Sequence, residues 1–358
     1  MKLEATTSGK DESALCKPTF GDMHSLGHKF ESTMDHEKQI DDMIVNLISA
    51  ANQQQGRDVC AELVVALNEA AELPTEVHPE LRKRVAQAIP KVKSESGAGV
   101  FGVWLGSSVE AGADPEVVVD EYMQSFLEIT KRIKTLPQDS EVPDVPLSEN
   151  LEVGVEYLGQ GLVAHIARCP DKRESYSQNS EMMTELSRVS HLSVGAYWVE
   201  TLLAKRSGEL VVIHAEELKG AHVRFKNISN CFHLFTLLQA ALQNRMPGAK
   251  SVDPDVLSVA IGEQHFDVND SAWWHFGQPE SSEPDIIASV FGEASPDSIG
   301  EVDGVRIMLL WSPILQDRSW DGGFFQPSLM AAPASVDLIE ELDESEVQAW
   351  HEKLGLST

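Results

Sequence analysis

Apolar residues recur at three- and four-residue spacing through the first part of the chain, which is the pattern of amphipathic helices. Proline, glycine and short polar residues that begin or end helices separate these apolar segments. The pattern predicts about seven helices, over residues 40–51, 59–70, 79–90, 100–109, 115–136, 149–169 and 180–205. Because no sequence period repeats among them, we expect an irregular bundle rather than a solenoid of helical hairpins.

The pattern changes beyond Gly208, where apolar and polar residues alternate with the period of a β-strand. Residues 209–216 and 221–227 predict a β-hairpin, and a helix follows at 231–244. The other predicted elements are a short helix at 254–259, a strand at 273–276, a helix or strand at 285–291, a central strand at 305–311 and a terminal helix at 343–354. The predicted fold class is α+β: a multi-helix bundle followed by a smaller mixed α/β domain with a three- or four-stranded sheet.

The length of 358 residues favours two domains. We predict a flexible N-terminal arm at residues 1–31, because Ser, Thr, Gly and charged residues dominate that segment. A helical domain follows at 32–206, with a Pro-rich acidic connector at 137–147, and the α/β domain occupies 207–358.

The charge balance bears on the choice of partner. The chain has 57 acidic and 28 basic residues, which gives a formal net charge of −29 at pH 7. Because this excess repels phosphate backbones and anionic lipids, we expect neither nucleic acid nor a membrane as partner. A basic protein partner fits the charge, although solubility alone also explains it.

The cysteine positions and the N-terminus indicate a reducing compartment. Cys16, Cys60, Cys169 and Cys231 are widely separated, without a Cys-x-x-Cys pair, so neither a disulfide framework nor a zinc ribbon is expected. The first residues lack the apolar segment of a signal peptide. No stretch approaches the roughly 18 apolar residues that span a bilayer. We therefore expect a cytoplasmic protein, and the oligomeric state stays open.

Two histidines of the hairpin are candidate metal ligands. If Ile213 pairs with Val223 on the inner face, His214 and His222 lie opposite each other on the outer face, beside Glu216. Two imidazoles and a carboxylate can bind a divalent metal such as zinc or iron. The alternative is a polar pair on a solvated sheet face, and a register shift of one residue separates the histidines. No other cofactor is evident.

Cys231 and His233 are the candidate catalytic residues. Asn230 is a good N-cap for the helix that follows the hairpin, which places Cys231 in the first helical turn. Unpaired amides at a helix N-terminus lower the pKa of a thiol, and His233 is near enough to assist. The alternative is a buried cysteine that acts as a small apolar residue.

Aromatic residues concentrate in the second half of the chain, and Trp273, Trp274, Trp320 and Arg318 are candidate ligand- or partner-binding residues. Trp and Arg anchor many protein interfaces, and aromatic walls also line ligand pockets. The third alternative is that these aromatic side chains fill the core of a small domain.

Motifs of well-marked enzyme classes are absent from the sequence. Gly97, Gly99 and Gly102 match a dinucleotide-binding pattern, but they lie in a predicted helical region, which indicates a flexible loop and a helix contact through small residues instead. The leading hypothesis is a cytosolic protein-interaction or regulatory module that binds its partner through helical and aromatic-rich surfaces. The alternatives are an enzyme or a small-ligand or metal-binding protein with its site near residues 209–242, and a structural subunit of a larger assembly.

Overall fold

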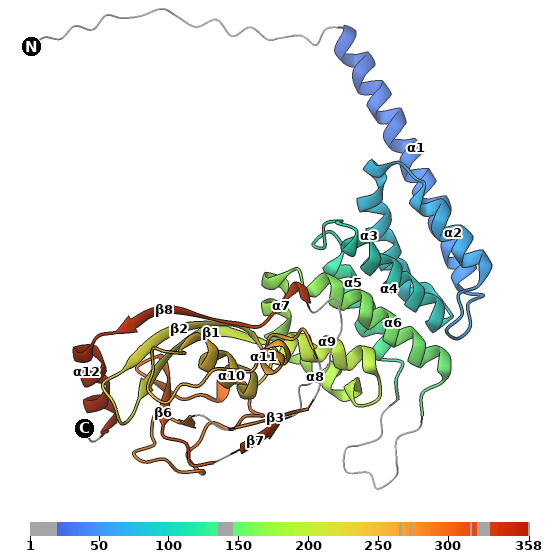
Figure 1. Cartoon of the computed structure of the whole chain (residues 1–358). Helices are drawn as coiled ribbons and strands as arrows, with labels where there is room; N and C mark the ends of the chain where they lie inside the picture. Colours follow the sequence, from blue (N-terminus) through green and yellow to red (C-terminus); the bar gives the residue numbers. More distant parts are fainter. Residues whose placement is uncertain are drawn as a thin grey trace, which may run out of the picture.

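The computed structural model describes residues 20–134, 146–264, 267–271, 274–315, 317–320 and 330–356. The side chains of residues 20–35, 269–271 and 317–318 are not part of this description. A helical part comes first in the chain and a sheet part follows, and the two lie side by side with α7 to α9 next to the sheet part (Figure 1). The fold is α+β, as predicted.

In the described residues, nine α-helices precede the first strand. They are α1 (Phe20–Ala51), α2 (Ala61–Ala71), α3 (His78–Ala88), α4 (Glu95–Glu110), α5 (Val119–Thr130), α6 (Glu149–Ile166), α7 (Pro170–Ser177), α8 (Ser180–Ser190) and α9 (Val194–Ala204). Two short 3₁₀ turns, η1 (Thr75–Val77) and η2 (Ile89–Lys91), flank α3. Local signals set several helix starts, since the side chains of Ser94, Ser148 and Asn179 accept backbone N–H groups at the N-termini of α4, α6 and α8.

The helix count exceeds the prediction of about seven for two local reasons. The predicted helix at 180–205 is two helices, because the chain breaks at residues 191–193 between α8 and α9. The short, highly charged α7 has no apolar periodicity that predicts it. In addition, α1 begins at Phe20, inside the predicted arm, whose residues 1–19 lie outside the described part. Most of the predicted connector, residues 137–145, also lies outside it.

Glycines let α4 and α6 pack with their backbones in close approach. A Cβ atom on Gly161 would lie 2.0 Å from the carbonyl oxygen of Gly102, and one on Gly99 would lie 3.0 Å from the Cα of Gly154. The Gly-x-Gly-x-x-Gly motif is thus a helix contact, which confirms the interpretation made from its helical context. The hydroxyl of Tyr122 on α5 donates to the carbonyl of Leu158 at 2.7 Å beside this contact.

The sheet part begins with the predicted hairpin. Its elements are β1 (Arg206–His214), β2 (Gly220–Ile228), α10 (Cys231–Ala241), α11 (Pro254–Ile261), β3 (Val268–Ser271), β4 (His275–Gly277), η3 (Pro296–Ser298), β5 (Glu301–Val302), β6 (Val305–Trp311), β7 (Asp317–Trp320), β8 (Ser335–Leu342) and α12 (Glu344–Leu354). The main sheet has the order β4-β6-β1-β2-β8, and β5 pairs with β6 outside this path. The β1–β6 pair is parallel and the other pairs are antiparallel, so the sheet is mixed.

Both faces of the main sheet are buried. Leu210 and Val212 of β1 pack with α10 and α11 on one face. Val211 and Ile213 pack with Val347 of α12 on the other face. Because each face has its own helical cover, β1 is apolar at successive positions, as strands covered on both sides are.

The predicted sheet of three or four strands is too small. The main sheet of the described residues has six strands, and β3 and β7 form a separate two-stranded sheet. The strand predicted at 305–311 is confirmed as β6, and its place between β4 and β1 is internal. The sequence gives little sign of β8, because its charged side chains lie on a partly exposed edge strand. Residues 285–291 form turns and a single bridge at Ser289 rather than a helix or strand.

No helix in the described part of the chain combines the length and the apolar character that crossing a bilayer requires.

Candidate functional site

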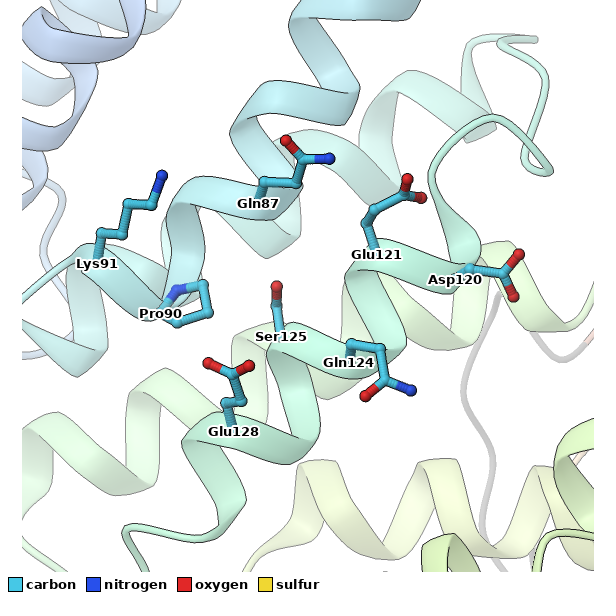
Figure 2. A pocket seen from close by; sticks show the side chains of 8 residues that line it. All are labelled: Gln87, Pro90, Lys91, Asp120, Glu121, Gln124, Ser125 and Glu128. Carbon is cyan, nitrogen blue, oxygen red and sulfur yellow. The ribbon is translucent and has the colours of Figure 1, made fainter.

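A groove of about 580 Å³ opens between α3 and α5 in the helical part (Figure 2). Its lining residues come from the end of α3, from η2 and from one face of α5; they are Gln87, Pro90, Lys91, Asp120, Glu121, Gln124, Ser125 and Glu128. Three carboxylates and one amine are among them, so the groove is acidic. Apart from Pro90, every lining residue has a polar or charged side chain.

The helical period of α5 explains why polar residues line the groove. Tyr122, Phe126 and Ile129 are fully buried in the core on the inner face of this helix. Residues 121, 124, 125 and 128 are spaced by three or four positions and therefore share a second face, next to the buried one. The hydroxyl of Ser125 donates to the carbonyl of Ala86 at 2.8 Å, which fixes α5 to α3 at the base of the groove.

Asp120 belongs to the rim of the groove and is already engaged. Lys172 and Tyr176 of α7 both donate to its carboxylate. Partial burial works against the charged form, but the two hydrogen bonds outweigh it and lower the pKa of Asp120. Its negative charge therefore serves mainly to hold α7 against α5.

Glu121 and Glu128 carry the charge that the groove presents to solvent. Glu121 forms an ion pair with Lys83 at 3.1 Å, whereas Glu128 is exposed and has no ion pair with any described residue. Figure 2 shows the two carboxylates along one side of the groove with Ser125 between them, and Gln87 and Lys91 on the facing segment. An ammonium or guanidinium group from another molecule can bind the carboxylate of Glu128, which is free, or that of Glu121, which already pairs with Lys83.

The hairpin register separates the two predicted metal ligands. Val211 pairs with His222, and Leu210 pairs with Val223, so the pairing of Ile213 with Val223 that would bring the two histidines together does not occur. His222 therefore lies on one face of the sheet and His214 on the other. The reason is that β1 is buried on both faces, so alternation along the strand could not decide which residues face inward.

Each histidine instead has local partners. His222 lies between two carboxylates, 3.1 Å from Glu209 and 3.6 Å from Glu340. His214 is buried, and its backbone carbonyl accepts from the ring of His351 at 3.0 Å. Within the described residues, no group of three or more His, Cys, Asp or Glu side chains is arranged to hold a metal ion.

Cys231 stands where the sequence predicts, but it lacks the properties of a reactive thiol. Asn230 caps α10 by accepting the backbone N–H of His233 at 3.2 Å, which confirms the predicted cap. The backbone amides of Cys231 and Phe232 donate to the carbonyls of Ala294 and Gly292, respectively. These two amides are therefore not free to stabilise a thiolate. Burial raises the pKa of the Cys231 thiol to about 12, which is the opposite of the lowering that free amides at a helix N-terminus would cause.

His233 is buried next to Cys231 in the chain but faces other groups. Its ring lies 5.2 Å from the ring of Trp320, measured between centroids. Burial lowers the pKa of His233 to about 4, and the charge of Lys205 contributes to the shift. The imidazole is therefore neutral at physiological pH.

The predicted aromatic surface is largely interior. Trp274 is fully buried and donates to the carbonyl of Pro247 at 2.7 Å, while Trp320 is buried against Phe232 with ring centroids 5.8 Å apart. These two tryptophans therefore fill the core, which is the alternative that the sequence left open. Trp273 and the side chain of Arg318 lie outside the described residues.

A second, smaller pocket of about 260 Å³ opens beside β4. Ile286, Phe291 and Leu315 line it, and each has at least two fifths of its surface exposed. Sequence analysis missed this pocket because residues 285–291 lack a regular period. The acidic groove was missed for a different reason: the polar face of α5 is visible in the sequence, but its facing segment is not.

Comparison of the chain with protein-family models, with curated proteins and with solved structures finds no match.

Proposed function

We propose that this protein is a cytosolic interaction module whose α3–α5 groove binds a basic segment of a partner protein. The observation that carries the proposal is the exposed carboxylate of Glu128, unpaired in the described structure and aligned with Glu121 along an open groove. The net charge of −29 supports it, because the field of the whole chain attracts a basic partner and repels nucleic acid.

The spacing of the two carboxylates defines the partner segment. Glu121 and Glu128 are seven residues apart on one helix, which corresponds to about 10 Å along the axis. A peptide in the polyproline II conformation rises about 3.1 Å per residue with three residues per turn, so about three residues cover this distance and every third side chain lies on the same face. The best match is therefore a segment with lysine or arginine at every third position, and its cations replace or share the contact that Lys83 makes with Glu121.

The test measures binding of a fluorescent peptide with lysine at every third position to the full chain. We expect binding that weakens steeply as salt rises from about 0.05 to 0.3 M, since counterions screen these contacts over roughly 10 Å. Glu128→Lys should weaken binding about tenfold or more, which is about 1.4 kcal/mol. Because Glu128 is exposed and forms no ion pair with any described residue, this change leaves the fold intact, which circular dichroism can check.

Glu69→Lys is the matched control. Glu69 is exposed on α2, and its replacement by lysine changes the net charge by the same amount as Glu128→Lys. Glu69 lies outside the α3–α5 groove. An equal loss of affinity in both variants would mean that only the overall charge acts, and the groove assignment would then be wrong. Binding that ignores salt would also contradict the proposal.

A further inference from the structure

The pocket of about 260 Å³ beside β4 has an apolar rim that is open to solvent. Ile286, Phe291 and Leu315 line this pocket, and their exposed fractions are 55%, 57% and 42%. Their chain neighbours Ile287 and Ile314 are also exposed, at 86% and 40%. We call Ile286, Phe291 and Leu315 the apolar rim. Because burial of large apolar side chains is favourable, a group of them left in solvent around one pocket marks a binding surface.

Hydrogen bonds fix the segment that carries most of the apolar rim. On one side, the amide of Val290 donates to the carbonyl of Phe276 in β4 at 2.8 Å. On the other side, the amide of Phe232 in α10 donates to the carbonyl of Gly292 at 2.8 Å. A Cβ atom on Gly292 would lie 2.3 Å from the ring of Phe232, so this ring packs directly on the segment and lines the pocket. The pocket is therefore formed before a partner arrives, which lowers the entropy cost of binding.

The size of the pocket favours a single side chain over a small-molecule ligand. Small-molecule pockets usually have volumes of about 300–1,000 Å³. At about 260 Å³ this pocket lies below that range, but it has room for one aromatic or branched aliphatic group. Because Ile287 and Ile314 do not line the pocket, a compound held inside it would leave both of them in solvent. A protein segment covers the pocket and the surface around it, with one anchor side chain inside.

The charge around the pocket is negative. Residues 278–293 contain no lysine, arginine or histidine, and their acidic residues are Glu280, Glu283, Asp285 and Glu293, all of which are exposed. Glu293 lines the pocket and forms no ion pair with any described residue. A cation next to the anchor side chain would therefore have a carboxylate to pair with. A second copy of this chain would bring its own net charge of −29 to this surface, which opposes self-association.

We propose that the apolar rim and its pocket bind a segment of a partner protein in which one large apolar side chain is flanked by lysine or arginine. The apolar side chain enters the pocket against Phe232 and Phe291, and the neighbouring cation pairs with the carboxylate of Glu293. This surface lies in the sheet part, whereas the α3–α5 groove lies in the helical part. Its occupation therefore does not depend on the function proposed for that groove.

The experiment measures fluorescence anisotropy of a short labelled peptide, with one phenylalanine between two lysines and otherwise glycine and serine, titrated with the full chain. A second peptide has alanine in place of phenylalanine. We expect the phenylalanine peptide to bind at least about tenfold more tightly, because only its ring fills the pocket. Both peptides carry the same lysines, so any binding of lysine to the α3–α5 groove is common to the two. Equal binding of the two peptides would overturn the proposal.

Variants assign the binding to this pocket. Ile286→Ser should weaken binding of the phenylalanine peptide at least about fivefold, since it removes part of the apolar rim. Ile339→Ser is the matched control, because Ile339 is an exposed isoleucine of β8 that does not line the pocket. Glu293→Gln should reduce the advantage of lysine over glutamine as the flanking residue of the peptide. Equal losses in the two isoleucine variants, or an unchanged lysine advantage in Glu293→Gln, would refute the assignment.

Two measurements test the other possible occupants. Sedimentation velocity should give the same distribution for the unaltered chain and for Ile286→Ser. A dimer that Ile286→Ser abolishes would assign the apolar rim to a second copy of the chain and would contradict the proposal. Benzylamine, which carries an aromatic ring and an amine without a peptide, should bind at least about tenfold more weakly than the phenylalanine peptide. Equal affinities would mean that the pocket is a small-ligand site instead.

Discussion

Two buried histidines couple the stability of this protein to pH at the scale of single residues. Burial lowers the pKa of both His165 and His233 to about 4, from an ordinary value of 6.5. Around His165, the charges of Arg82 and Arg168 add to the effect of burial. The unfolded chain takes up these protons near pH 6.5, but the folded chain does so only near pH 4, so stability is full above pH 7 and is lost between about 6.5 and 4.

The size of this effect can be measured by urea unfolding at several pH values. Each histidine contributes about 3 kcal/mol across that window. His165→Phe, which keeps the ring beside Tyr122, should flatten the slope of stability against pH by about half. A double variant with His233→Phe should remove most of the slope between pH 6.5 and 4. An unchanged slope in the double variant would show that these rings are not the groups that titrate.

The positions of single residues can be predicted from the sequence where neighbouring residues determine them. The Asn230 cap and the position of Cys231 follow from a few neighbouring residues. The surroundings of Cys231 do not follow from its neighbours in the sequence. Its backbone amide donates to the carbonyl of Ala294, which is far along the chain.

At the scale of elements, the α4–α6 contact depends on the absence of side chains. We expect Gly161→Ala to destabilise the protein by about 3 kcal/mol or more, because the new Cβ would meet the backbone oxygen of Gly102 at 2.0 Å. Urea unfolding with intrinsic fluorescence measures the change.

Gly262→Ala provides the control for the glycine itself. Gly262 has a positive φ of 89°, and no atom lies within 4 Å of the position of a new Cβ. The Gly262→Ala substitution should therefore lower the free energy of unfolding by only about 1–2 kcal/mol, through backbone strain. If both variants lose the same stability, close helix packing is not the reason for glycine at position 161.

Elements with strong periodicity were predicted and those without it were not. β6 matches its predicted range, since seven successive residues of mostly apolar character read as a covered strand. β8 and α7 were missed because charged residues dominate both. The order of the strands depends on long-range pairing, which a local pattern does not contain.

At the scale of the whole molecule, the net charge of −29 sets a repulsion that the folded state must overcome. We expect the midpoint of thermal unfolding to rise by a few degrees when sodium chloride increases from about 0.05 to 0.5 M, because screening shortens the range of repulsion to roughly 4 Å. Choline chloride should act equally if screening is the cause. A lower midpoint at high salt would mean that the surface ion pairs contribute more to stability than the repulsion removes.

The strand order has a consequence for synthesis of the chain. Among the described residues, the core of the helical part uses residues from Ile40 to Leu203 and, from later positions, only Ala332, so it can assemble while translation continues. The hairpin of β1 and β2 cannot complete its sheet at that stage. The parallel neighbour of β1, strand β6, begins only at Val305, and the outer neighbour of β2, strand β8, ends at Leu342. At roughly 5–20 residues per second, the hairpin waits several seconds with unpaired edges and apolar faces exposed on the ribosome. The nascent sheet, rather than the helical part, is thus the stage of biogenesis most open to aggregation.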